Sequence, residues 1–167
     1  MRLSIVIFFV ACTSCSDGIA SSLFANANAW NLDDFSYNTL LHAMSKESDQ
    51  WLSYAEDVLQ EMKDKNVGIS QVTYHGMMNI HAKSSSGDGA KKAEEFLRGM
   101  EAEGVSLNDM SYNICIDAYA RRGDHRKAQS LLEEMLSLSD CGNVECRPSI
   151  HSFASVVRLY RRCVFCG

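Results

Sequence analysis

The sequence predicts an all-α protein, a right-handed solenoid in which antiparallel helix pairs stack on one another. Three observations lead to this prediction. One pattern recurs along the chain, each copy has apolar residues at helical spacing, and the 167 residues include a single proline, which leaves long stretches free to form helix. One helix pair of this size cannot bury its apolar face alone, whereas stacked pairs can.

The repeated unit consists of two blocks. The first block reads DDFSYNTLLHAMSK from Asp33, QVTYHGMMNIHAKS from Gln71 and DMSYNICIDAYARR from Asp109. The second block reads SYAEDVLQEM, KKAEEFLRGM and RKAQSLLEEM, and an incomplete fourth copy, IHSFASVVRLYRR, begins at Ile150. We therefore expect repeat 1 over residues 33–70, repeat 2 over 71–108, repeat 3 over 109–149 and a partial repeat 4 over 150–167.

Each block predicts an amphipathic helix, because the residues assigned to its buried face recur at positions i, i+3, i+4 and i+7. In the first blocks these are Tyr37, Leu40, Leu41 and Met44; Tyr74, Met77, Met78 and His81; Tyr112, Cys115, Ile116 and Tyr119; and Phe153, Val156, Val157 and Tyr160. In the second blocks they are Ala55, Val58, Leu59 and Met62; Ala93, Phe96, Leu97 and Met100; and Ala128, Leu131, Leu132 and Met135. The small alanine lets the partner helix approach closely. The partial repeat 4 should leave Val156 and Val157 poorly covered.

Residues 1–30 do not follow the pattern. Arg2 precedes an apolar run from Leu3 to Ala11, and small and polar residues follow. This arrangement is typical of a signal sequence, and the run is too short to span a membrane comfortably. A two-part leader for plastid import by the secretory route begins in the same way. The alternatives are an unreliable start of the sequence or a helix from a lost upstream repeat.

The charge of the chain gives mixed evidence on whether it binds nucleic acid. The net charge of −5 and the pI of about 5.5 argue mildly against a nucleic-acid binder. However, basic residues gather in the first blocks and the turns after them, whereas acidic residues gather in the second blocks. If the first helices line a concave surface, that surface is basic, and a phosphate backbone responds to the local potential more than to the net charge. The alternative is that the acidic second helices are simply solvated surfaces with local ion pairs.

We find no constellation for catalysis, and expect neither an enzyme nor a bound cofactor or metal. The segment SSSGDGAKK lacks the spacing of a phosphate-binding loop. Cys12-x-x-Cys15 and Cys163-x-x-Cys166 lie about 148 residues apart, without neighbouring ligands to complete a zinc site. Cys141 and Cys146 bracket a loop, and the sequence does not decide whether a disulfide joins them.

The details of the unit resemble one family. Its first block opens with Ser or Thr, then Tyr, then Asn or His, and its second ends in Glu-Met or Gly-Met before the tails KDKNV and EAEGV. A tetratricopeptide unit would show Trp and a Leu-Gly pair instead. From Asp33 to Arg162 the chain resembles the pentatricopeptide repeat family, which belongs to the tetratricopeptide-like helical superfamily. Arg147-Pro148-Ser149 resembles the family's closing Lys-Pro-Asp, although the first two tails lack the proline.

The resemblance implies binding of single-stranded RNA, with one base recognised per repeat. The base-reading pairs would be Asn38 with Ser70, His75 with Asn108, and Asn113 with Ser149, and the two asparagine pairs suggest C or U. The stacking walls would be Phe35, Val72, Met110 and His151, and the phosphate contacts Lys46, Lys83, Arg121, Arg122, Arg161 and Arg162. The alternative for Asn38 and Asn113 is hydrogen bonding to free backbone N–H groups near a helix start.

At the level of the whole protein, the resemblance implies a role in the processing, stability or translation of an organellar transcript, in a plastid or mitochondrion. The alternative is a scaffold that binds other proteins, since helical solenoids also present concave surfaces to peptides.

Overall fold

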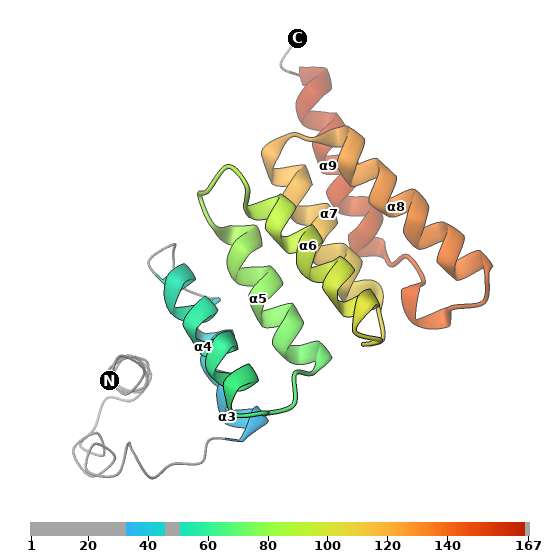
Figure 1. Cartoon of the computed structure of the whole chain (residues 1–167). Helices are drawn as coiled ribbons and strands as arrows, with labels where there is room; N and C mark the ends of the chain where they lie inside the picture. Colours follow the sequence, from blue (N-terminus) through green and yellow to red (C-terminus); the bar gives the residue numbers. More distant parts are fainter. Residues whose placement is uncertain (1–32, 46–50, 166–167) are drawn as a thin grey trace, which may run out of the picture.

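The computed structural model describes residues 33–45 and 51–165, except for the side chains of residues 159 and 162–165. The helices are α3 (Asp34–Met44), α4 (Leu52–Asp64), α5 (Gln71–Lys83), α6 (Gly89–Ala102), α7 (Asp109–Arg122), α8 (His125–Asp140) and α9 (Ile150–Phe165), with a 3-10 helix η2 (Val144–Cys146) before α9. The predicted all-α solenoid of antiparallel helix pairs is confirmed (Figure 1). The repeat boundaries between these helices stay a prediction.

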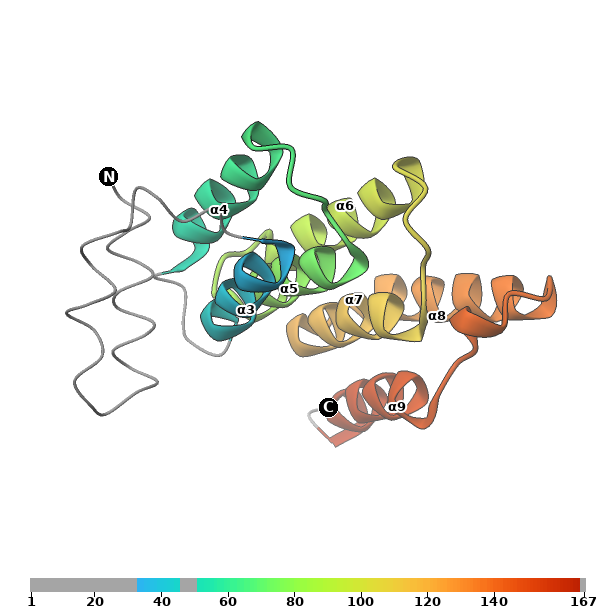
Figure 2. The same cartoon turned by 90° about the horizontal axis from the view of Figure 1, so that it is seen from below.

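The helices form two curved layers (Figure 2). The first helices α3, α5, α7 and α9 pack directly against one another in chain order, and the second helices α4, α6 and α8 cover their outer side. Each second helix packs between the first helix of its own pair and the first helix of the next. As a result, the first helices lie on the inner side of the arc.

The core follows the apolar pattern of the sequence. One buried cluster joins α3, α4 and α5 around Tyr37, Leu41 and Met62. A second cluster joins the helices from α5 to α9 around Leu97, Tyr112 and Met135, and Phe96 on α6 packs against both clusters. The alanines that begin the second helices, Ala55, Ala93 and Ala128, are all fully buried, because close packing there leaves room for no larger side chain.

Three cysteines lie within the described part of the chain, and all three are free. Cys115 is buried, and burial raises the pKa of its thiol to about 12, so it acts as the small apolar residue that the pattern predicted. Cys141 is exposed, whereas Cys146 is buried and its Sγ donates to the carbonyl of Leu107 at 3.3 Å. The sequence did not decide on a disulfide between Cys141 and Cys146, and the structure shows that none is formed.

Helix α9 departs from one expectation. Val156 is buried in the second cluster, although a partial repeat was expected to leave it uncovered. The reason is that α7 and α8 together cover the face of α9 that carries this residue. Val157 is 63% exposed, as expected. Among the residues described, no helix is both long and apolar enough to cross a membrane.

Candidate nucleic-acid interface

Exposed apolar side chains recur at one position of the first helices. Phe35, Val72 and Met110 are each the second residue of α3, α5 and α7, and they are 75%, 58% and 54% exposed. His151 holds the same position in α9 and is also exposed. Three large apolar groups at equivalent exposed positions bury nothing inside the protein, so packing does not explain them.

One helical turn further along, α3, α5 and α7 each carry the polar residue that follows the tyrosine of the repeat. Asn38 and Asn113 are partly exposed, and His75 is 8% exposed. We call the surface formed by the two sets of residues the first-helix face: Phe35, Asn38, Val72, His75, Met110, Asn113 and His151.

Each of these polar residues bonds to a hydroxyl of the next first helix. The hydroxyl of Thr73 donates to Asn38 Oδ1 at 2.7 Å. The Oγ atom of Ser111 lies 2.8 Å from His75 Nε2. The hydroxyl of Ser152 donates to Asn113 Oδ1 at 2.6 Å. The contact therefore recurs at every junction between successive first helices in the described structure.

These three hydroxyls also contact the second member of each predicted reading pair, which lies at the start of the same helix as the hydroxyl. Ser70 and Asn108 are the N-caps of α5 and α7, and Ser149 directly precedes α9. The backbone N–H groups of these residues donate to Thr73 Oγ1 at 3.2 Å, Ser111 Oγ at 3.5 Å and Ser152 Oγ at 3.1 Å. At Ser70 and Asn108 these bonds form one half of a reciprocal capping box, which stabilises the helix start.

Each predicted reading pair is thus joined through one hydroxyl, which belongs to the third residue of the following first helix. Asn113 Nδ2 also donates directly to Ser149 Oγ at a long 3.4 Å. Thr73, Ser111 and Ser152 were not predicted as members of the site, although a Ser or Thr before each Tyr or Phe is visible in the sequence. Their contacts depend on the register that places the hydroxyl of one repeat against the polar residue of the repeat before it, which the sequence does not show.

Asn38 and Asn113 do not cap the helices on which they lie. The backbone of α3 is capped by Asp33, whose carboxylate accepts from Ser36 N–H at 2.9 Å. The backbone of α7 is capped by Asn108, whose side chain accepts from Ser111 N–H at 2.9 Å. The alternative explanation of the two asparagines, as partners of free N–H groups at a helix start, is therefore wrong.

His75 stands out chemically among these polar residues. Burial lowers the pKa of its imidazole, and the nearby Asp109 and Asn108 only partly oppose this effect. The ring is therefore neutral at physiological pH, with one nitrogen that donates and one that accepts.

The predicted phosphate-contacting residues lie in different surroundings. Lys83 donates to the carbonyl of Ser45 at 2.7 Å, and Arg121 pairs with Asp117. Arg122 donates to the carbonyls of Ser84, Ser86 and Gly87. Arg161 is exposed on α9, whereas Lys46 and the side chain of Arg162 lie outside the described residues. The phosphate-contacting role stays a prediction for all six.

A groove of about 460 Å³ brings three of these basic residues together. It is lined by Lys83, Arg121, Arg122 and the turn from Ser84 to Gly87. Because their present partners are a carboxylate and backbone carbonyls, the ammonium and guanidinium groups keep a positive charge at this end of the first helices. Three basic side chains therefore gather between α5 and α7, and the basic concave surface expected from the sequence stays a prediction.

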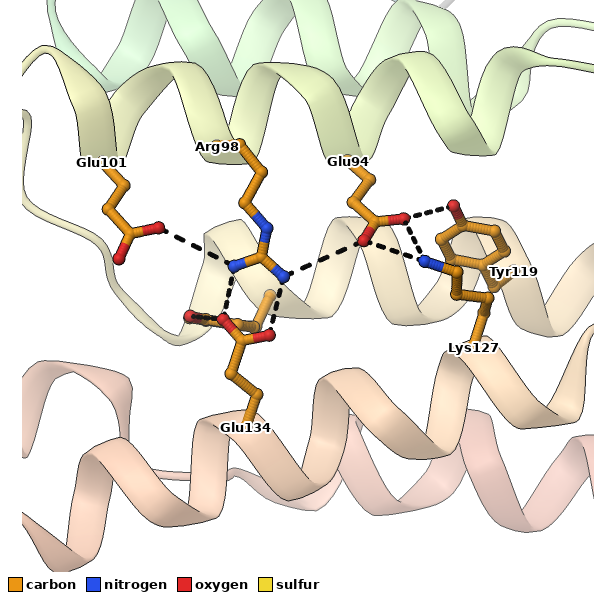
Figure 3. A network of polar contacts seen from close by, with 7 residues as sticks. Glu94, Arg98, Glu101, Tyr119, Lys127 and Glu134 are labelled. Carbon is orange, nitrogen blue, oxygen red and sulfur yellow. Dashed lines mark hydrogen bonds and ion pairs between the residues drawn. The ribbon is translucent and has the colours of Figure 1, made fainter.

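The outer side carries a different kind of polar network (Figure 3). Arg98 on α6 binds Glu134 on α8 through both nitrogens, at 2.5 and 2.7 Å, and it lies 3.8 Å from Glu94 and Glu101. Glu94 also accepts from the hydroxyl of Tyr119 at 2.5 Å and pairs with Lys127 at 3.2 Å. The acidic second helices therefore use part of their charge in contacts between repeats, and not only in the local ion pairs of the alternative reading.

The described residues contain no group of three or more His, Cys, Asp or Glu side chains placed to hold a metal ion. Both Cys-x-x-Cys pairs lie outside the residues whose side chains are described.

Comparison with known proteins identifies the repeats. The family model for the PPR repeat matches residues 35–67 and 110–139. No curated protein sequence matches the chain.

Two solved structures are similar in fold. The PPR domain of Arabidopsis thaliana protein-only RNase P 1, solved in complex with tRNA, has a TM-score of 0.65 and 20% identity over 99% of this chain and 80% of its own. The pentatricopeptide repeat protein PPR10 from maize has a TM-score of 0.69 and 22% identity over 97% of this chain and 21% of its own. The chain thus spans about a fifth of the maize protein. The PPR repeat model therefore matches two segments of the chain, and the fold of the chain is similar to that of solved pentatricopeptide repeat proteins.

Proposed function

We propose that this chain binds single-stranded RNA selectively through its first-helix face, with one base recognised at each of the three reading pairs. The observation that carries the proposal is the exposure of Phe35, Val72 and Met110 at equivalent positions, each one turn before a polar residue. Flat apolar contact on both sides of a base, with hydrogen bonds to its edge, is how proteins commonly recognise unpaired RNA.

The similar structures support the proposal. The Arabidopsis domain was solved in complex with tRNA, and the maize protein was also solved with an 18-nt psaJ RNA element. The basic groove beside Lys83, Arg121 and Arg122 supports it as well, since a phosphate backbone needs positive charge along its path.

The expected affinity is modest. Stacking contributes roughly 1–3 kcal/mol per base, so three bases give weak binding before phosphate contacts are added. Affinity should therefore fall as salt rises, because bound Lys and Arg side chains release counterions from RNA.

The test measures fluorescence anisotropy of the full chain with labelled pyrimidine-rich and purine-rich RNA 10-mers at two salt concentrations. The double variant Val72→Ser/Met110→Ser should weaken binding by about tenfold or more, since it removes walls on both sides of one base position. The control is Val144→Ser, which changes an exposed apolar residue of η2. Binding without base preference or salt dependence would contradict the proposal and favour a protein-binding scaffold.

We also propose that the chain acts by binding RNA and not by chemistry on it. The support is the absence of a catalytic constellation in the sequence. End-labelled RNA incubated with the purified chain should remain full length, and cleavage that follows the protein through every purification step would contradict this.

Finally, we propose that the chain acts on an organellar transcript in a plastid or mitochondrion. It rests on the signal-like residues 1–30 and on the family. Fusion of these residues to a fluorescent protein tests it in plant or algal cells, where organellar fluorescence is the expected result. Uniform cytosolic fluorescence would contradict it.

A further inference from the structure

We propose that Thr73, Ser111 and Ser152 are positioning residues that set the hydrogen-bonding polarity of the reading side chain before them. In this proposal, repeats 1 and 3 present hydrogen-bond donors to a base, whereas repeat 2 presents an acceptor. It rests on the proposed RNA binding and specifies which base edges the same face selects.

In repeat 1, the bonds of one hydroxyl fix the orientation of an amide. Thr73 Oγ1 accepts from the backbone N–H of Ser70 at 3.2 Å, so its own proton is free to point elsewhere. That proton goes to Asn38 Oδ1, at 2.7 Å. With its oxygen engaged, Asn38 leaves the two N–H groups of Nδ2 as the part of the amide that can meet a ligand.

Repeat 3 has the same arrangement. Ser152 Oγ accepts from Ser149 N–H at 3.1 Å and donates to Asn113 Oδ1 at 2.6 Å. The long 3.4 Å contact from Asn113 Nδ2 to Ser149 uses one N–H at most, so the second stays available.

In repeat 2 the polarity is reversed. Ser111 Oγ lies 3.0 Å from Asn108 Oδ1 and 2.8 Å from His75 Nε2. An amide oxygen carries no proton, so the close contact with Asn108 requires the single hydroxyl proton of Ser111. Nε2 of His75 must then be the nitrogen that donates to Ser111.

This assignment leaves the other ring nitrogen of His75 as an acceptor, because a neutral imidazole has one proton for its two nitrogens. Burial keeps the ring neutral by lowering its pKa. The exposed walls lie next to this residue in sequence and structure. Val72 is one turn earlier on α5, and Met110 directly precedes Ser111, the residue that bonds the ring.

Bases differ at the ring nitrogen in the middle of their Watson–Crick edge. In cytosine and adenine it is a bare acceptor, whereas in uracil and guanine it carries a proton. A donor from Asn38 or Asn113 therefore suits cytosine better than uracil among the pyrimidines. The acceptor of His75 suits uracil or guanine, which gives the second repeat a specificity opposite to that of its neighbours.

The test uses the full chain and three 9-mers, CCCCXCCCC, in which X is uridine, cytidine or 3-methyluridine. Binding to the uridine probe should be about fivefold tighter than to the other two, since one net hydrogen bond is at stake. The methyl group removes the N3 proton and leaves the carbonyls in place. Equal affinity for uridine and 3-methyluridine would overturn the inference while leaving RNA binding intact, whereas no binding to any probe would contradict the proposed function itself.

Variants separate positioning from folding. His75→Asn should reverse the preference, so that cytidine at X binds more tightly than uridine. Ser111→Thr keeps the hydroxyl and should keep the uridine preference, whereas Ser111→Ala should bring the uridine-to-cytidine ratio towards one. A purely structural role of Ser111 would lower the melting temperature without changing this ratio. An unchanged ratio in both folded His75→Asn and folded Ser111→Ala would overturn the assignment.

Discussion

The guanidinium group of Arg98 on α6 binds both carboxylate oxygens of Glu134 on α8, at 2.5 and 2.7 Å. Glu134 also accepts from the hydroxyl of Tyr112, at 2.9 Å, so three helices meet at one carboxylate. The bond to Arg98 lowers the pKa of Glu134, and the bond from Tyr112 adds to this effect. Long charged side chains therefore join second helices whose backbones are spread apart on the outer side of the arc.

Arg98→Met should lower the free energy of unfolding by about 1 kcal/mol, because it removes a bidentate pair that is partly open to water and screened by salt. Urea unfolding measures this loss, and the matched control is Arg126→Met, which changes an exposed arginine of α8.

Glu134 has a lower pKa when folded than when unfolded. Its contribution is therefore present above about pH 4.5 and is lost as pH falls through the folded pKa. If Arg98→Met is as stable as the wild type, the pair of Arg98 and Glu134 contributes nothing to the free energy of unfolding.

Leu97→Ala should be much more damaging. Leu97 is fully buried in the second cluster, and removal of its side chain leaves a cavity between helices, at a cost of roughly 2–5 kcal/mol. Thermal unfolding followed by circular dichroism is the measurement. Leu136→Ala, at an exposed position of α8, should change the melting temperature little. Similar shifts for the two variants would contradict the assigned core.

Gly89→Ala tests a close approach at the start of α6. An added Cβ would lie 2.2 Å from the backbone carbonyl oxygen of His81, and backbone atoms cannot move aside as a flexible side chain does. We expect a loss of about 1–3 kcal/mol from this overpacking, measured by urea unfolding. Gly68→Ala, where an added Cβ meets nothing within 4 Å, is the control. A neutral Gly89→Ala would mean that the turn before α6 is looser than the structure indicates.

His81 makes stability depend on pH. Its imidazole is buried, its two nitrogens have no hydrogen-bond partner, and Glu56 lies 3.8 Å from Nε2. Burial lowers its pKa, and Lys92 adds to this, against the opposing effect of Glu56 and Glu95. Because the unfolded chain binds the proton more readily, the free energy of unfolding should fall as pH drops below the ordinary histidine value of about 6.5.

The next repeat provides the variant for this test. Tyr119 holds the position equivalent to His81 and donates to Glu94, which is equivalent to Glu56. His81→Tyr should therefore give Glu56 a donor and reduce the loss of stability between pH 7.5 and 5.5, while His75 retains its part of that loss. An unchanged difference between the two pH values would contradict the role of His81.

Periodicity was enough to predict the helices and most of the core. The apolar positions at i, i+3, i+4 and i+7 correctly indicated buried residues such as Tyr37, Met77 and Ile116. Val157 followed the template but is exposed, because no second helix of repeat 4 packs on α9 in the described structure. Coverage depends on neighbours from other repeats, which a local pattern does not contain.

The site was predicted less completely. The resemblance to the repeat family pointed to Phe35, Val72 and Met110, which the structure shows to be exposed, and their role as stacking walls stays a prediction. The contacts of Thr73, Ser111 and Ser152 were not predicted, since they depend on the register between repeats. The assignment that we propose for the two nitrogens of His75 needed the distances from Ser111 Oγ to two neighbours at once, which no sequence pattern supplies.

The most direct test of RNA binding by the first-helix face is photocrosslinking of the full chain to a C-rich RNA 10-mer with 4-thiouridine at single positions, followed by mass spectrometry of the crosslinked peptides. We expect crosslinks within α5 and α7, near Val72 and Met110, and their loss in the Val72→Ser/Met110→Ser variant. Crosslinks confined to the outer helices α6 and α8, or equally frequent in wild type and variant, would contradict the account.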